Sequence, residues 1–156
     1  MARIVIADDD ELVGEVACGA LIAEGHAAGL VTNGRDALEV ILARRPDLAI
    51  LDCNMPRLNG LLVLRELRQL PEFYELPVLI LTGRRSAKDV ELAYFQGAND
   101  YLKKPFDPTE LVLRVQALLD KRPKQQCLQQ PRANGAFGRL RQQNWAGDPS
   151  TQFADL

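Results

Sequence analysis

The sequence predicts an α/β fold in which helices cover both faces of a doubly wound, five-stranded parallel sheet. Short β-branched runs alternate with helical patterns through residues 1–122, and this alternation is typical of βαβ units. Polar residues follow several of the runs, as expected where parallel strands end at a ligand site. The chain has 156 residues, of which 47% are hydrophobic and 26% charged, so it reads as a globular protein of one domain.

Five runs carry the strand pattern, and each is short enough to cross a sheet once. They are Arg3–Ala7, Ala27–Val31, Leu48–Leu51, Val78–Leu81 and Asp100–Lys103. The segments between the early runs place apolar residues at helical spacing, so each is expected to turn one apolar face toward the sheet. These faces comprise Val13, Val16, Ala17, Ala20 and Leu21, then Ala37, Val40 and Ile41, then Leu61, Leu64 and Leu67.

Local signals mark where helices begin and end. Asp107 and Pro108 supply an N-cap and a first-turn proline before a last helix. Gly25 and Gly97 stand where left-handed C-caps are expected. After Arg122 the composition changes, and residues 123–156 hold seven of the ten glutamines. We therefore expect a domain over residues 1–122 and a flexible Gln-rich linker or tail over residues 123–156.

Charge and composition exclude several classes of function. Residues 1–122 carry a net charge of −4 and the tail +2, so the domain has no basic stripe and is not expected to bind nucleic acid. No apolar run is long enough for a membrane span and no signal segment opens the chain, which predicts a cytoplasmic protein. Cys18, Cys53 and Cys127 form no CxxC pair, which argues against a zinc site.

Chemically active side chains gather where the strands end. In chain order they are Asp8, Asp9 and Asp10, then Asp52, then Thr82, then Lys104. Carboxylates that converge on one sheet edge repel one another unless they share a cation, and Mg²⁺ prefers such oxygen ligands. An aspartate beside Mg²⁺ and a lysine is a competent nucleophile toward phosphorus, and a threonine hydroxyl can hydrogen-bond a phosphoryl oxygen.

With these residues in place, the chain resembles the receiver domain of two-component response regulators, over residues 2–122. The matching segments are Ile4–Asp10, Asp52–Pro56 with Gly60, Leu81–Gly83 and Gly97–Phe106. The resemblance implies a CheY-like, flavodoxin-like fold with strand order 2-1-3-4-5. It also implies a phosphoacceptor signalling domain rather than an enzyme.

The resemblance assigns the phosphoacceptor and the metal ligands. Asp52 is implied as the phosphoacceptor. Asp9 and Asp52 would ligate Mg²⁺ directly, together with the backbone carbonyl of Asn54, and Asp8 would act largely through water. Asn54 and Arg84 stand at the positions that tune the lifetime of the phosphoryl group in this family.

Further residues are implied as the switch and the pocket. Lys104 would pair with the phosphoryl group, while Thr82 and Tyr101 would form the switch pair. Gly83 would leave room for the phosphoryl group, and Pro105, after a cis peptide bond, would complete the pocket.

The implied partner is a sensor histidine kinase or a phosphotransfer protein. A switched face formed by the fourth helix, fifth strand and fifth helix, about residues 86–121, would act on an effector or a partner. A homodimer through this face, with Asp100 contacting Arg114 between subunits, is a further expectation. The sequence leaves open whether the chain acts alone or is cut from a longer regulator.

Two alternative functions remain. A scaffold receiver that never accepts phosphate is disfavoured, because it has no physical need to keep the complete charged constellation. A Mg²⁺-dependent phosphohydrolase with an aspartyl intermediate would need a second aspartate two residues after the nucleophile, where this chain has Asn54.

Overall fold

Five parallel strands form the centre of the protein. The computed structural model describes residues 1–83 and 97–121. The strands are β1 (Arg3–Ala7), β2 (Ala27–Val31), β3 (Leu48–Asp52), β4 (Val78–Thr82) and β5 (Asp100–Lys103). They lie in the order β2-β1-β3-β4-β5 and every neighbouring pair is parallel, which confirms the predicted topology.

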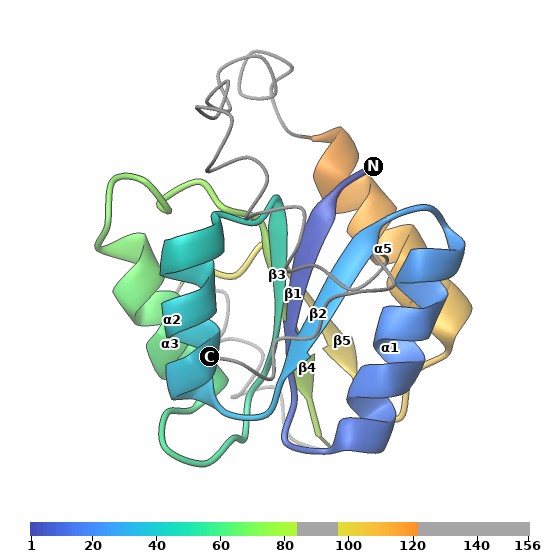
Figure 1. Ribbon diagram of the computed structural model, residues 1–156, viewed down its shortest axis with the longest axis horizontal. Helices are drawn as coiled ribbons and strands as arrows, with labels where there is room; N and C mark the ends of the chain where they lie inside the picture. Colours follow the sequence, from blue (N-terminus) through green and yellow to red (C-terminus); the bar gives the residue numbers. More distant parts are fainter. Residues whose placement is uncertain (84–96, 122–156) are drawn as a thin grey trace.

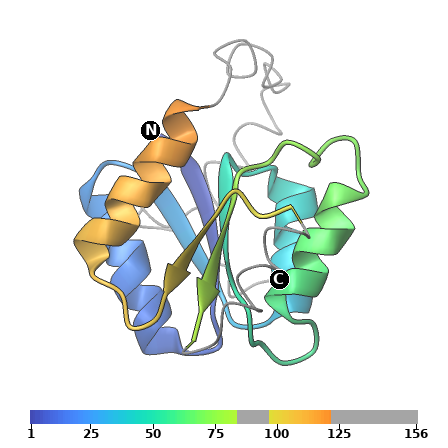
Figure 2. The same cartoon turned by 180° about the vertical axis from the view of Figure 1, so that it is seen from behind.

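Four helices of the described residues cover the two faces of this sheet. They are α1 (Glu11–Ala23), α2 (Gly34–Arg44), α3 (Gly60–Arg68) and α5 (Pro108–Asp120). Figure 1 shows α1 and α5 on one face and α2 and α3 on the other, and Figure 2 shows the same layers from behind. The expected fourth helix at the start of the 86–121 face, Arg84 and the tail lie outside the described residues.

Alternating side chains of the central strands divide the core into two layers. In β1, Ile4 and Ile6 pack under α1 and α5, whereas Val5 and Ala7 pack under α2 and α3. All four side chains are fully buried. Because helices cover both faces of such a parallel sheet, ligands reach it at the ends of the strands. They bind at the edge where the carboxyl ends of the strands lie.

Two strands run one residue further than the sequence predicts. Asp52 is the last residue of β3 and pairs in register with Leu81, while Thr82 ends β4 opposite Lys103. Hydrogen bonding to neighbouring strands therefore fixes the backbone of both residues. Their side chains project from a rigid sheet rather than from a loop.

Helix α1 is turned differently from the prediction. Gly14, Ala17 and Leu21 are its buried residues, whereas Val16 is 44% exposed. Gly14 lies so close to the side chain of Leu30 that a Cβ at this position would overlap it. Because α1 is apolar on nearly every side, the spacing of its apolar residues did not show which side faces the sheet. The close approach of Gly14 to Leu30 selects that side.

Polar side chains fix where each helix begins. Asp10 caps α1, Asn33 caps α2, Asn59 caps α3 and Asp107 caps α5, each accepting a hydrogen bond from a backbone N–H of the first turn. Gly25 follows α1 with φ +89°, as expected for a left-handed C-cap. Among the described helices, none combines the length and apolar character that crossing a membrane requires.

Candidate functional site

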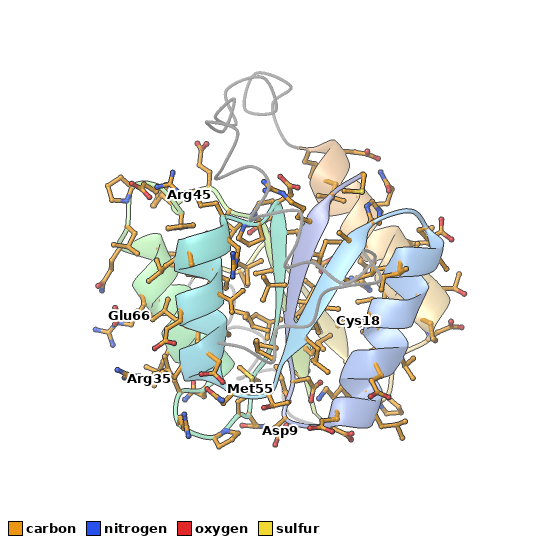
Figure 3. The ribbon with its side chains drawn as sticks, in the orientation of Figure 1. Asp9, Cys18, Arg35, Arg45, Met55 and Glu66 are labelled. Carbon is orange, nitrogen blue, oxygen red and sulfur yellow. The ribbon has the colours of Figure 1, made fainter. Side chains whose placement is uncertain are left out.

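The predicted site residues meet at the edge where β1, β3, β4 and β5 end. Asp52 and Thr82 close β3 and β4, while Asp8 and Asp9 follow β1 and Lys104 follows β5. Figure 3 labels Asp9 at this edge of the molecule. Thus the parallel topology gathers side chains that are up to 96 positions apart in the sequence.

Three carboxylates form the acidic part of the site. One carboxylate oxygen from each of Asp8, Asp9 and Asp52 lies within 4.8 Å of the others. Asp8 is fully buried and Asp52 is 4% exposed, whereas Asp9 faces solvent. Asp10 belongs to the same acidic run, but its side chain caps α1 instead, accepting from the N–H of Leu12 at 3.0 Å. The donor set, three hard carboxylates with one open side, fits Mg²⁺.

Lys104 places one cation between the two buried carboxylates. Its Nζ lies 2.6 Å from Oδ2 of Asp8 and 3.1 Å from Oδ2 of Asp52. Burial lowers the pKa of Lys104, but hydrogen bonds and attraction from Asp8 and Asp52 outweigh this effect and raise the pKa above its ordinary value. Lys104 therefore stays protonated and offsets part of the repulsion between the carboxylates.

The electrostatics of Asp52 reflect competing influences. Burial is the largest influence and raises the pKa of Asp52, and repulsion from the nearby Asp8 carboxylate acts in the same direction. Hydrogen bonds from Lys104 and from the backbone N–H of Asn54, which lies 3.3 Å from Oδ1, act in the opposite direction. The net result of all influences on this pKa is a rise from 3.8 to about 6. Near neutral pH the carboxylate is ionised and able to act as a nucleophile.

Thr82 presents a polar atom that the described part of the protein leaves unsatisfied. The residue is 2% exposed, and its Oγ1 has no hydrogen-bond partner among the described residues. A buried hydroxyl without a partner carries a free-energy cost that a bound acceptor would remove. This observation fits a phosphoryl oxygen beside the strand end.

Comparison with known proteins identifies this arrangement. A profile of the response regulator receiver domain family matches residues 4–116. The chain belongs to this family. It is a receiver domain of the kind found in two-component systems, and the resemblance drawn from the sequence is confirmed.

Curated relatives and solved structures agree with the assignment. The response regulator MprA of Mycolicibacterium vanbaalenii is 44% identical over 117 residues, which cover 75% of this chain and 50% of that protein. MprA of Mycobacterium ulcerans gives the same identity and coverage. The chain thus spans about half the length of the curated relatives it matches.

Two solved structures show the same fold. One is the crystal structure of a putative response regulator from Chloroflexus aurantiacus, 35% identical with a TM-score of 0.74, covering 77% of this chain and 98% of that one. The other is the receiver domain of a Pseudomonas aeruginosa sensor histidine kinase with a magnesium ion in its active-site cleft. It is 29% identical with a TM-score of 0.71, again covering 77% of this chain and 98% of that one.

The other predicted residues of the receiver site lie around this centre. Tyr101 is half-buried and packs against the core layer under α2 and α3. The Lys104–Pro105 peptide bond is cis, as expected. No atom of the described residues lies within 4 Å of the point where a Cβ of Gly83 would project, and the side chain of Asn54 is exposed.

The loop after Asp52 is held close to the strand by Gly60, the first residue of α3. The N–H of Gly60 donates to the carbonyl of Cys53 at 3.3 Å. A Cβ at Gly60 would overlap the backbone carbonyl of Asp52. Only glycine permits this approach, so Gly60 supports the receiver site although it takes no part in its chemistry.

Sequence reasoning missed Arg68, which ties α3 to the segment before β5. Its guanidinium donates to the carbonyl of Gly97 at 2.9 and 3.0 Å, to the carbonyl of Phe73 at 2.9 Å and to Oδ1 of Asn99 at 2.8 Å. Burial lowers the pKa of Arg68. No local signal reveals these contacts, because an arginine in the last turn of a helix is normally solvated.

Proposed function

We propose that Asp52 accepts a phosphoryl group from the phosphohistidine of a sensor kinase or phosphotransfer protein, and that the receiver domain then acts as a timed switch. The observation that carries the proposal is the placement of Lys104 between Asp8 and Asp52, at the same sheet edge as Thr82, whose Oγ1 has no partner among the described residues. A nucleophile, a cation and a hydroxyl donor thereby gather at one edge of the sheet. In-line phosphoryl transfer is promoted by groups that position the reactants and stabilise the charge on the transferred phosphoryl group.

The residues that would hold Mg²⁺ are Asp9 and Asp52, with the backbone carbonyl of Asn54 and, through water, Asp8. When bound, the ion supplies positive charge to phosphoryl oxygens and to the crowded carboxylates. The magnesium ion in the Pseudomonas receiver cleft supports this assignment.

In the proposed transfer, Asp52 is the nucleophile and the donor imidazole is the leaving group. A carboxylate oxygen of Asp52 bonds to phosphorus while the phosphorus–nitrogen bond of the donor breaks, and the imidazole leaves with the electron pair. Lys104, which stays protonated, balances charge on the transferred group. The hydroxyl of Thr82 donates to a phosphoryl oxygen, and Tyr101 turns toward the space that Thr82 leaves.

Phosphorylation adds about −1.5 to −2 charges to this edge. The change would spread to the face of about residues 86–121 and alter its affinity for a partner or an effector. Arg114 on this face contacts Asp100 at 3.0 Å and Glu110 at 2.9 Å within one chain. Dimerisation through the face would need these ion pairs to rearrange, and sedimentation with and without a phosphate mimic tests it.

Intact mass after incubation with acetyl phosphate tests the central proposal. We expect one phosphoryl group on the wild type in the presence of Mg²⁺, and none on Asp52→Asn or after chelation. A matched control is Asp120→Asn, which changes an exposed carboxylate in the last turn of α5 and leaves the site residues and the β5–α5 loop unchanged. An adduct that persists in Asp52→Asn would place the acceptor elsewhere, and Mg²⁺ binding without any adduct from small donors or kinases would favour the scaffold alternative.

A further inference from the structure

A cavity of about 430 Å³ opens beside Lys104, which contacts the candidate phosphoacceptor, between α1 and the loop that joins β5 to α5. Its size falls in the range of about 300–1,000 Å³ that is usual for small-molecule sites. The residues that line it are Leu12, Val13, Val16, Gly83, Lys104, Pro105 and Phe106. Apart from Lys104, every residue that lines it within the described part of the chain is apolar or glycine.

The apolar wall of this cavity is exposed to an unusual degree. Leu12 is 70% exposed and Val16 is 44% exposed, although both lie on a helix that packs against the sheet. Because the buried face of α1 is formed by other residues, no part of the described core needs these two side chains to be apolar. A ligand that covers them would remove hydrocarbon surface from water.

The opposite end of the cavity is charged. The Lys104 ammonium group borders the cavity and lies 3.1 Å from the carboxylate of Asp52. A ligand that fits both ends carries an anionic group beside Lys104 and a hydrocarbon part beside α1. Gly83 adds no side chain that would separate the two ends.

We propose that this cavity receives the leaving group of a phosphodonor, and that acyl phosphates with a hydrocarbon chain are preferred small-molecule donors. The proposal rests on the phosphoacceptor function of Asp52. A carboxylate oxygen of Asp52 bonds to phosphorus while the bond from phosphorus to the acyl oxygen breaks. The fatty carboxylate leaves with the electron pair, so the step needs neither a proton nor a redox partner.

The expected increase in rate follows from the apolar area that the hydrocarbon chain of the donor buries in the cavity. A fully buried methylene group strengthens binding by a factor of about four, and burial on one side by a factor of about two. Hexanoyl phosphate has four more methylene groups than acetyl phosphate and, with burial on one side, should therefore react about 16-fold faster at low donor concentration. Chain length barely changes the acidity of the leaving carboxylate, so the intrinsic reactivity of the donors stays the same.

The experiment measures the rate of single phosphoryl addition by intact mass for acetyl, propionyl, butyryl and hexanoyl phosphate with Mg²⁺. The double variant Leu12→Gln, Val16→Gln replaces the two most exposed apolar side chains of the cavity without adding charge, and it should lower the hexanoyl-to-acetyl rate ratio severalfold. Leu113→Gln is the matched control, because Leu113 is 64% exposed on α5 and does not line the cavity. It should keep the full ratio.

Each outcome decides between the two proposals. Equal rates for all four donors on the wild type would overturn the leaving-group site and leave the acceptor role of Asp52 intact. If the double variant kept the hexanoyl-to-acetyl rate ratio of the wild type, the preference for longer donors would arise outside this cavity. Absence of any adduct from all donors would count against the proposed function itself.

A binding measurement removes dependence on the reaction. Hexylphosphonate carries the same combination of anion and hydrocarbon but transfers nothing. In titrations followed by amide chemical shifts, it should perturb α1 and the β5–α5 loop more strongly than methylphosphonate. Equal responses to both phosphonates would contradict the proposal.

Discussion

Replacing Lys104 by methionine should destabilise the metal-free protein, because the substitution removes the cation that the two buried carboxylates share. The Nζ–Oδ2 distances of 2.6 Å to Asp8 and 3.1 Å to Asp52 correspond to attractions of about 6 and 5 kcal/mol at an effective dielectric constant of about 20. Desolvation of the ammonium group cancels much of this sum. Breaking a buried ion pair by removing one partner typically costs about 3–5 kcal/mol.

Proton uptake limits the loss, so we expect a decrease of about 3 kcal/mol in the free energy of unfolding near neutral pH. The pKa of Asp52 in the folded protein is already raised from 3.8 to about 6, and loss of Lys104 raises it further. An acid whose folded pKa is raised contributes stability below its unfolded pKa and loses it as pH rises through the folded pKa. The deficit of Lys104→Met should therefore shrink as pH falls from about 8 toward 5.

Urea unfolding followed by circular dichroism measures these free energies, with Mg²⁺ added in a second series. Mg²⁺ should stabilise the variant more than the wild type, because it replaces part of the missing charge. Lys103→Met is the matched control, since Lys103 is the exposed neighbour on β5. A variant as stable as the wild type at neutral pH, or a deficit that is independent of pH, would refute this account of the site.

Two further predictions concern residues outside the phosphoryl chemistry. Arg68→Met should lower the free energy of unfolding by about 2–4 kcal/mol, because the carbonyls of Gly97 and Phe73 lose their hydrogen-bond donor. The control Arg65→Met, on the exposed side of α3, should change the free energy of unfolding by less than about 0.5 kcal/mol. Urea titrations measure both values. Partial burial, with repulsion from Glu15, raises the pKa of Cys18 from 9.0 to about 12. Its alkylation by iodoacetamide near pH 8, measured by peptide mass, should therefore be about 1,000-fold slower than that of glutathione. Comparable rates would contradict the raised pKa of this thiol.

The sequence predicted most of the sheet and the centre of the site for one physical reason. Apolar runs of about five residues identify buried parallel strands, and such strands end at a common edge. The positions of the strand ends were therefore enough to predict that four side chains lie close together, those of Asp8, Asp52, Thr82 and Lys104. The bounds of β3 and β4 differed by one residue, because the hydrogen-bonded ladder continues through Asp52 and Thr82.

The features that the sequence did not reveal depend on packing between distant segments. The orientation of α1 is set by the approach of Gly14 to Leu30, so Val16 lies outside the core against expectation. The contacts of Arg68 join residues 29 and 31 positions apart. Neither arrangement leaves a periodic signal, because periodicity records only which face of an element is apolar.

The division of the core by the sheet has a consequence for protein engineering. Val63 and Leu67 belong to the layer under α2 and α3, whereas Val115 and Leu118 belong to the layer under α1 and α5. Residues in separate layers share no packing partners, so the effects of substitutions on the two sides should add. Stabilising changes can be accumulated beneath α2 and α3, and the gain can then be used to tolerate altered donor specificity on the side of α1.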